Sequence, residues 1–431
     1  MNHDSGRRRF LQTASAAPFL AMPAALAVEA GVKQPSETLV VGVIGVGGRG
    51  TQHTRNFAAM NGVQVAYVCD VDNRRAGLAA DAAHRAADGK PKAKPVGDLR
   101  TVLDDRAVDA VVIATCNHWH APAAILACAA GKHVYVEKPC SHNPREGELL
   151  VEAARKHNRV VQMGNQRRSW PKVMEAIEQI RSGAIGRPYF AECFYTNNRG
   201  SIGHGQPGPV PAWLDYELWQ GPAARQPYRD NILHYNWHWF WNWGNGELGN
   251  NGVHMLDVAR WGLGVDYPVH VTSSGGRYRF EDDQETPDTH VVSFDFDGRK
   301  TITWQGKSCN GARPGTSRAD VVFYGENGAL EIDGGGYTIK DLKGKPTKKV
   351  TGQGGDATHL ANFVAAARGE AKPNSEIEEG HRSTLLCHLG NIAHRTGRAL
   401  RCNSKDGRIL DDPEAMRFWS REYAPGWEPK V

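Results

Sequence analysis

The sequence predicts an α/β protein with an N-terminal Rossmann domain, a doubly wound parallel sheet, and a C-terminal α+β domain with a large, open, mainly antiparallel sheet. Between residues 39 and 165, apolar strands alternate with amphipathic helices, which implies right-handed crossovers and a parallel sheet. After about residue 165, apolar residues recur at every second position, as in strands with one open face. A chain of 431 residues is long for one domain, so two are expected.

The predicted elements follow in chain order. The expected strands of the first domain are Val40–Gly45, Val63–Cys69, Val108–Thr115, His133–Val136 and Val160–Met163. Helices are expected between them at Thr51–Met60, Asn73–Ala86, Pro122–Ala130 and Pro144–His157. In the second domain we expect a helix at Pro171–Arg181 and strands at Tyr189–Tyr195, His290–Phe296, Lys300–Gly306, Asp320–Tyr324 and Ala329–Asp333.

An insertion rich in Gly, Pro and aromatic residues spans residues 196–246 of the second domain. Trp occupies alternate positions at 237, 239, 241 and 243, so an extended segment there would present one aromatic wall. Such a wall could stack on a carbohydrate, but a core strand or an oligomer contact is favoured. The predicted boundaries are 1–27 for a signal peptide, 28–38 for a linker, 39–165 and 166–400 for the domains, and 401–431 for a tail.

The N-terminus has the pattern of a twin-arginine export signal. Arg7-Arg8-Arg9-Phe10-Leu11 precedes an apolar run over Ala14–Leu26, and Ala25-Leu26-Ala27 offers a cleavage site. We therefore expect the twin-arginine machinery as a partner and a periplasmic or other extracytoplasmic location; whether the signal is removed stays open. Because that route carries folded proteins, a cofactor would be loaded before export and retained between turnovers.

Composition excludes several classes of protein. Loss of residues 1–27 removes three Arg and one Asp, which lowers the formal charge from +5 to +3, and no basic run predicts nucleic-acid binding. The only long apolar stretch is short for a membrane span and contains Pro18 and Pro23. The eight cysteines form no C-x-x-C pair and no metal-ligand spacing, so buried free thiols are expected and no metal site is predicted.

A glycine-rich turn indicates a dinucleotide site. Gly45, Gly47 and Gly50 have G-x-G-x-x-G spacing after an apolar strand, and Asp70 ends the next strand 20 residues after Gly50. A carboxylate there accepts ribose hydroxyls and repels a 2′-phosphate, so NAD is favoured over NADP, although Arg74 and Arg75 keep NADP open. Further cofactor contacts are predicted for Gly48, Arg49, Thr115, Asn117, His120, Glu137, Lys138, Asn165 and Gln166.

Two segments bring polar groups to the carboxyl edge of the predicted sheet. Residues 114–120 end a central strand with Asn117 and His120, and residues 130–139 form a strand that delivers Glu137 and Lys138. Ligands of doubly wound sheets bind beyond this edge. A lysine beside a nicotinamide can orient a substrate hydroxyl and share its proton.

These motifs resemble the Gfo/Idh/MocA family, which includes inositol 2-dehydrogenase and glucose-fructose oxidoreductase. The resemblance also rests on residues 246–257, 356–363 and 378–382, and covers nearly all of the predicted mature chain. It implies that Lys138 is the active-site lysine and His254 the base that takes a proton from a sugar hydroxyl. Asn250, one helical turn before His254, is a third catalytic candidate. The family commonly has Asp there, and Asn cannot act as a base.

The leading hypothesis is an exported NAD(P)-dependent oxidoreductase that acts on a hydroxyl of a sugar, glycoside or cyclitol and retains its cofactor. One variant of this hypothesis is a redox-neutral exchange, in which a second substrate reoxidises the bound cofactor. The alternative is a glycoside hydrolase that oxidises, eliminates, hydrates and reduces, because the chain also resembles exported NAD-dependent α-N-acetylgalactosaminidases in its cofactor half. Lys138 favours the first hypothesis, whereas Asn250 and the export signal favour the second. A sugar-binding or assembly protein with structural NAD is least favoured. A homo-oligomer is expected from the open sheet face.

Overall fold

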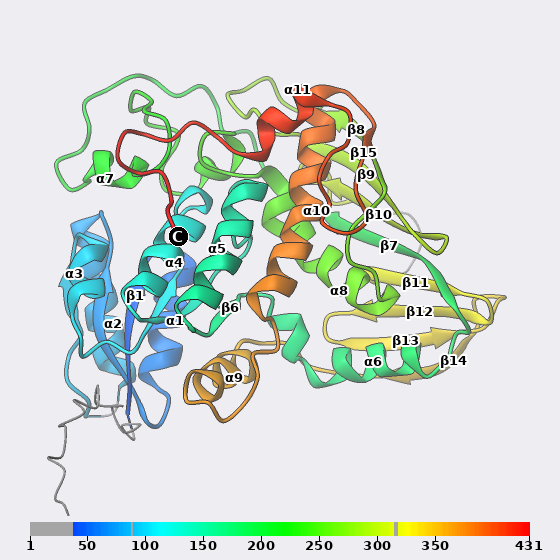
Figure 1. Cartoon of the computed structure of the whole chain (residues 1–431), viewed down its shortest axis with the longest axis horizontal. Helices are drawn as coiled ribbons and strands as arrows, with labels where there is room; N and C mark the ends of the chain where they lie inside the picture. Colours follow the sequence, from blue (N-terminus) through cyan, green and yellow to red (C-terminus); the bar gives the residue numbers. More distant parts are fainter. Residues whose placement is uncertain (1–37, 88, 314–317) are drawn as a thin grey trace, which may run out of the picture. The chain divides into compact units, whose positions relative to one another are not determined.

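The computed structural model describes residues 38–431 with the exception of residues 88 and 314–317. The predicted signal peptide and all but the last residue of the predicted linker lie outside the described residues. The described chain contains two sheets, one of six strands and one of nine, labelled in Figure 1. This arrangement confirms the predicted fold class.

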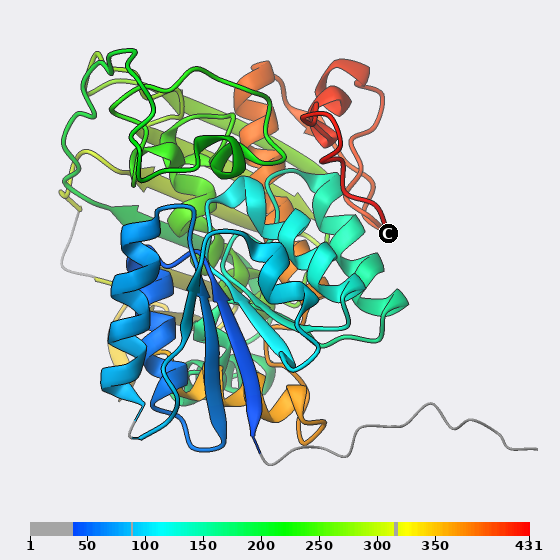
Figure 2. The ribbon, with the colours of Figure 1, turned by 90° about the vertical axis from the view of Figure 1, so that its left-hand side faces the viewer.

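The six-stranded sheet is wholly parallel, in the order β3-β2-β1-β4-β5-β6 of a dinucleotide-binding fold. Its strands are β1 (Leu39–Ile44), β2 (Val63–Cys69), β3 (Lys94–Val96), β4 (Ala110–Ile113), β5 (His133–Val136) and β6 (Val161–Met163). Its helices are α1 (Gly48–Ala58), α2 (Asn73–Ala86), α3 (Leu99–Asp104), α4 (Asn117–Ala129) and α5 (Pro144–Lys156). Figure 2 shows these helices on both faces of the sheet.

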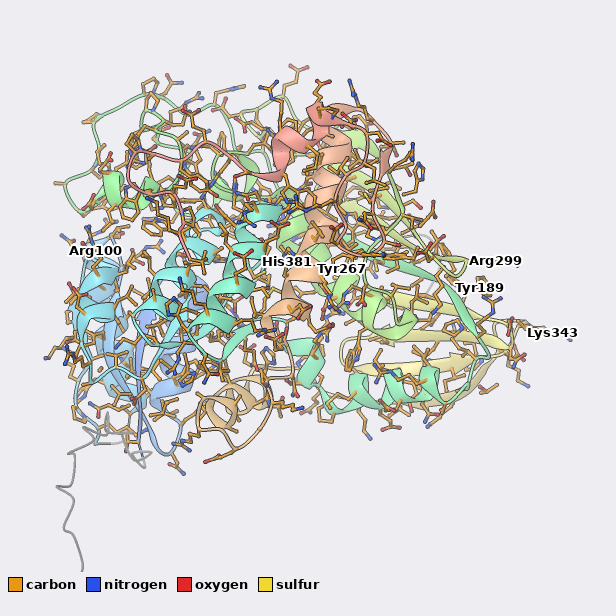
Figure 3. All side chains as sticks on the ribbon, viewed as in Figure 1. Arg100, Tyr189, Tyr267, Arg299, Lys343 and His381 are labelled. Carbon is orange, nitrogen blue, oxygen red and sulfur yellow. The ribbon has the colours of Figure 1, made fainter. Side chains whose placement is uncertain are left out.

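The nine-stranded sheet is mainly antiparallel, with one parallel pair between β7 and β10. Its strands are β7 (Pro188–Thr196), β8 (His270–Gly276), β9 (Thr289–Phe296), β10 (Lys300–Lys307), β11 (Val321–Gly325), β12 (Gly328–Asp333), β13 (Gly336–Lys340), β14 (Pro346–Val350) and β15 (Leu400–Arg401). Arg299 and Lys343 lie at the tips of the β9–β10 and β13–β14 hairpins (Figure 3).

Helices cover one face of the large sheet. These are α6 (Pro171–Arg181), α8 (Val253–Leu263) and α10 (Ile377–Thr396), and α10 also packs on α5 of the first domain. The main hydrophobic core is therefore continuous across both domains. Helix α9 (Ala357–Ala367) inserts Phe363 against Phe57 and Tyr135 of the first domain. The smaller elements are η1 (Gln166–Ser169), α7 (Tyr216–Gln220), η2 (Asn236–Trp239), η3 (Leu248–Gly252), α11 (Pro413–Met416) and η4 (Arg417–Trp419).

Some elements differ from the sequence prediction. Helix α4 begins at Asn117 rather than Pro122, so residues 117–120 form its first turn instead of the end of a strand. Strands β3, β8, β13, β14 and β15 were not predicted, because they are short or rich in Gly, Ser or exposed Lys and lack an apolar alternation.

The insertion folds around its own small core rather than around a Trp-lined strand. Trp237 and Trp243 are buried in a cluster with Trp219 and Tyr216, whereas Trp241 contacts Arg395 instead. The alternate Trp residues fall in a 3₁₀ turn and the loop after it, so they do not form one wall. The eight cysteines are free thiols, seven of them buried, as predicted. Within the part that the structure describes, no helix combines the length and apolarity that a bilayer crossing requires.

Candidate active site

The turn between β1 and α1 is shaped by two glycines. Gly45 has φ +81°, and a Cβ there would lie 2.7 Å from the backbone nitrogen of Thr115. A Cβ on Gly50 would lie 1.8 Å from the carbonyl oxygen of Gly45, so only glycine lets α1 approach the strand. By contrast, a Cβ on Gly48 would meet nothing within 4 Å. The turn therefore leaves open space at the N-terminus of α1, which suits a pyrophosphate.

Asp70, at the end of β2, holds this turn in place. Its carboxylate accepts hydrogen bonds from the backbone N–H groups of Val46 at 2.8 Å and Asp72 at 2.9 Å. Burial raises the pKa of Asp70, and those N–H groups oppose the shift. Arg75 lies over the same turn, with its Nη1 3.1 Å from the position of a Cβ on Gly47. A carboxylate and a guanidinium thus both face the place where a ribose would bind.

A cavity of about 350 Å³ lies at the carboxyl edge of the parallel strands, and residues of the insertion form part of its lining. Eleven of the predicted site residues line it: Gly45, Gly47, Gly48, Arg49, Asp70, Thr115, Asn117, His120, Glu137, Lys138 and Asn250. Four do not: Gly50, which packs under the turn, and Asn165, Gln166 and His254. The predicted site is thus largely assembled in one cleft.

Glu137 is the centre of a buried charged network beside this cleft. Its Oε1 accepts from Arg49 Nε at 2.8 Å and lies 2.7 Å from His53 Nε2. Arg49 also binds both oxygens of Asp356, at 2.7 and 2.8 Å. Burial alone would raise the pKa of Glu137, but Arg49, His53 and Lys138 hold it well below its usual range. The anionic Glu137 therefore fixes the segment that carries Lys138.

Lys138 reaches from β5 to the helix that carries the other catalytic candidates. Its Nζ donates to the carbonyl oxygen of Asn250 at 2.7 Å and to Asn250 Oδ1 at 3.2 Å. Asn250 lies in η3, a π-helical turn that continues into α8. π-turns within helices are frequent at functional sites because they re-aim side chains. Burial lowers the pKa of Lys138, and Glu137 partly opposes this, so its proton is easier to share.

His254 follows the π-turn, in the first turn of α8. Its Nδ1 is buried and has no hydrogen-bond partner among the described residues. Burial, and then Lys138, hold the pKa of His254 well below its ordinary value, so the imidazole is neutral and one of its ring nitrogens is unprotonated. His254 does not line the nucleotide cavity itself, although the charge of Lys138 contributes to the lowering of its pKa.

The start of α4 joins two turns of the sheet edge. His120 lies with Nδ1 2.6 Å from the carbonyl oxygen of Pro139 and Nε2 3.0 Å from that of Thr115. Burial lowers the pKa of His120. The neutral ring carries one N–H group, so it donates to one of these two carbonyl oxygens. Asn165 and Gln166, after β6, have buried side-chain amide atoms without partners among the described residues. They lie behind the Glu137 segment, where Gly164 is packed against the Glu137 carboxylate.

The insertion contributes cavity residues that the sequence did not predict: Leu214, Leu218, Trp219, His234, Tyr235, Trp237 and His238. His238 is the most informative. Its Nδ1 lies 2.6 Å from the carbonyl oxygen of Tyr235, so Nδ1 carries the proton and Nε2 is an acceptor. Its ring stacks on Trp237 with centroids 3.6 Å apart, and burial lowers its pKa to about 3. The dense mixture of His and aromatic residues was the only signal for it in the sequence.

These residues fit a nicotinamide dinucleotide. The open space over Gly48 fits the phosphates, Asp70 and Arg75 face the ribose of the adenosine half, and Lys138 lies at the other end of the cavity. Among residues 38–431, outside the gaps at 88 and 314–317, no group of three or more His, Cys, Asp or Glu side chains could hold a metal ion.

Comparison with known proteins defines the class. Residues 39–165 match the sequence profile of an oxidoreductase family with an NAD-binding Rossmann fold, and residues 198–428 match the C-terminal alpha/beta domain of the same family. The fold and these matches define the class as a family of oxidoreductases with an NAD-binding domain. The chain belongs to the Gfo/Idh/MocA family.

Similarity to individual relatives covers part of their length. Inositol 2-dehydrogenase 2 of Saccharopolyspora erythraea is 32% identical over 231 residues, 53% of this chain and 55% of that protein. A glycosyl hydrolase family 109 protein of Shewanella baltica is 29% identical over 212 residues, 45% of this chain and 46% of that protein. The chain thus spans about half the length of the curated relatives it matches.

Solved structures show the same fold. The WlbA dehydrogenase of Bordetella pertussis, in complex with NADH and UDP-GlcNAcA, superposes with a TM-score of 0.65. It is 18% identical, and the match covers 85% of this chain and 99% of that chain.

Proposed function

We propose that this protein is a nicotinamide-dependent oxidoreductase that acts on a secondary hydroxyl of a sugar, glycoside or cyclitol, with NAD rather than NADP as its retained cofactor. The observation that carries this proposal is the Lys138–Asn250 contact at the end of the cavity away from Asp70. A buried lysine with a lowered pKa, next to an amide and near a neutral histidine, can bind a hydroxyl and share its proton. The names of the relatives, inositol 2-dehydrogenase among them, favour the same substrate class.

Each residue has a distinct part in this proposal. Lys138 Nζ donates to the substrate oxygen, while Asn250 binds a neighbouring hydroxyl. His254, neutral and with no partner on Nδ1, accepts the hydroxyl proton. The cofactor, when bound, would accept the hydrogen of the alcohol carbon together with its two electrons, as a hydride. His238 Nε2 accepts from a further hydroxyl and sets the orientation of the ring.

Contacts of the insertion support retention of the cofactor. Leu214 forms a bridge with Asp72, and the backbone N–H groups of Asn73 and Asp215 donate to Trp213 and Val71. Trp213 also stacks on the Arg74 guanidinium, whose carbon lies 3.6 Å from the ring centroid. The insertion is therefore pinned to the carboxyl end of β2, directly over the adenosine half of the cavity. These contacts would slow the release of a dinucleotide.

The second candidate is a glycoside hydrolase that regenerates NAD within each turnover. Asn250 favours it, because an amide cannot supply the charge that usually supports a dehydrogenase base. The similarity to the glycosyl hydrolase family 109 protein favours it as well. Lys138, which holds Asn250 directly, favours the oxidoreductase.

The deciding experiment identifies the cofactor and follows its redox state. Mass spectrometry of the denatured protein, purified without added cofactor, should find NAD at close to one per chain. Absorbance at ~340 nm that rises with one sugar and falls with a second supports the oxidoreductase, whereas aglycone release without a net change supports the hydrolase.

Replacement of His254 by Ala should lower turnover by ~10²–10⁴-fold with NAD still bound, and an unchanged rate would remove it from the mechanism. A protein that is isolated without nucleotide and turns over only with excess free NAD would contradict retention.

We further propose export by the twin-arginine machinery and a homo-oligomeric state. The Arg7-Arg8 pattern supports the first, and the partly exposed Tyr189 (Figure 3) and Val291 on strands of the large sheet support the second. Replacement of both arginines by Lys should keep the protein in the cytoplasm. A monomeric mass by light scattering would contradict the oligomer.

A further inference from the structure

A second cavity, of about 350 Å³, lies outside the nucleotide cleft. Four parts of the chain line it: the start of α5, the end of the insertion, the face of α10 toward the C-terminus, and the segment after η4. Residues of the nucleotide cavity do not line it. Its volume is within the range of small-molecule sites and suits a ligand of about hexose size.

Arg421 brings an incompletely satisfied guanidinium to this cavity. Its Nη2 is occupied, since it donates to the His118 carbonyl oxygen at 2.8 Å and lies 2.8 Å from Glu146 Oε1. Its Nε and Nη1 are buried and have no partner among the described residues. Buried N–H groups without acceptors cost free energy, so two donors are left available to a ligand.

Asn245 and His142 have further polar atoms without hydrogen-bond partners in the described chain. Asn245 is 5% exposed, and its Nδ2 donates to the His142 carbonyl oxygen at 2.9 Å, but its Oδ1 has no partner in the described chain. Both ring nitrogens of His142 are likewise buried without partners. Burial, and then Arg421, keep the pKa of His142 well below its ordinary value, so the ring offers one donor and one acceptor.

Arginines outnumber carboxylates among the lining residues, although Glu146 pairs with Arg421 and Glu285 acts on Arg395. Arg395 stacks on Trp241 and Phe418, with its guanidinium carbon 5.0 and 4.1 Å from the ring centroids. Arg417 adds a third guanidinium, and Glu422 is the only carboxylate among the lining residues. A guanidinium held flat on aromatic rings keeps its N–H edge free for an anion.

We propose that this cavity is a second binding site, for a small anion that also carries hydroxyl groups. Arg421 and Arg395 would bind the carboxylate or phosphate, as guanidinium groups do with paired N–H donors. Asn245 Oδ1 and the acceptor nitrogen of His142 would each take a hydrogen bond from a hydroxyl. A neutral sugar would leave the guanidinium groups unsatisfied, and a simple inorganic anion would leave these two acceptors unsatisfied.

The test is calorimetric titration of the full chain, carrying Lys138→Met, with the nucleotide cleft saturated by NAD. The substitution weakens binding of a sugar at the substrate end of that cleft and its oxidation there, whereas Lys138 does not line the second cavity. Gluconate, glucose 6-phosphate and glucose are the probes. Binding of gluconate or of glucose 6-phosphate, with glucose at least about tenfold weaker, supports the site and shows which anion it prefers. Absence of binding by both anionic probes at millimolar concentration, or equal binding of glucose, would overturn it.

Two variants locate the binding. Arg395→Gln removes a charge at the cavity mouth, and Ala224→Leu fills space without a change in charge. Each substitution should weaken binding of the anionic probe by about tenfold or more. Arg395→Gln removes a hydrogen bond to a charged group, and Ala224→Leu takes up space that the ligand needs. Arg398→Gln, on a paired arginine that follows α10 and does not line the cavity, is the matched control. Unchanged affinity in both cavity variants, or an equal loss in the control, would overturn the proposal.

Discussion

Lys138 Nζ donates to both oxygens of Asn250, the backbone carbonyl at 2.7 Å and Oδ1 at 3.2 Å. The contact joins the last residues of a parallel strand to a π-turn of the second domain, and so fixes the position of the lysine at the cleft. A substrate hydroxyl can replace the Oδ1 contact while the carbonyl contact holds the lysine in place.

Replacement of Lys138 by Met keeps an unbranched side chain of nearly the same length and removes its charge and its N–H donors. We expect turnover to fall by ~10²–10⁴-fold, because the hydroxyl loses its donor and proton partner. NAD content, measured on denatured protein, should not change. Lys156→Met, at the exposed end of α5, is the control and should retain full activity. A Lys138 variant with normal turnover would exclude the proposed role.

His238→Phe keeps an aromatic ring against Trp237 but removes the Nε2 acceptor. The expected result is a roughly tenfold lower kcat/KM for the sugar, about the value of one hydrogen bond, with the cofactor still bound. His204→Phe, on an exposed histidine of the same insertion, tests for a general effect of the substitution. Equal kinetics of the two variants would show that His238 does not contact substrate.

Trp213→Ala should release the cofactor. The variant loses the stack on Arg74 and part of the packing that pins the insertion to β2. After extensive dialysis, the fraction of chains that still contain NAD should fall severalfold relative to the parent protein. Trp241→Ala alters the same insertion away from the nucleotide cavity and should retain its cofactor. Equal retention in both variants would contradict the role of Trp213 in holding the cofactor.

Acid should destabilise the fold through its buried histidines. Burial lowers the pKa of His118, His238, His290 and His388 to about 3. Their ordinary pKa is about 6.5, so the unfolded chain binds more protons as the pH falls from 6.5 towards 3, and stability is lost in that window. Each histidine contributes up to about 1.4 kcal/mol per pH unit.

Urea unfolding between about pH 7 and about pH 5 measures this slope. His388→Asn removes one of these titrating histidines, and its slope should be shallower than that of the parent protein. An identical slope would contradict the assignment.

The parallel sheet and its glycine turn were predictable because each depends on local rules. The backbone at Gly45 has a positive φ, and Gly50 lets helix and strand approach closely. Both requirements select glycine, so they are visible in the sequence as the G-x-G-x-x-G spacing. The start of α4 was not predictable in the same way. Pro122 is typical of a first helical turn, yet it lies inside α4, and Cys116 before Asn117 gives no capping signal.

The contribution of the insertion could not be predicted. His238 reaches the cleft because the insertion crosses the sheet edge and is pinned there by Trp213 and Leu214, which is a tertiary contact with no periodic pattern. The sequence did predict Lys138, since a strand of known direction carries it to the carboxyl edge. Residues on regular elements were therefore easier to place than residues on an irregular segment.

The separation of the cleft into a sheet edge and an irregular cover has an evolutionary consequence. The glycine turn, Asp70 and Lys138 are tied to the core of the sheet, where most changes would damage folding. The insertion has its own small core, and many of its hydrogen bonds to the first domain use its backbone atoms, which changes of side chain leave in place. Under the proposed function, drift of its side chains would exchange one accepted substrate for another while the cofactor half stays intact, so closely related sequences with different insertions should diverge first in what they oxidise.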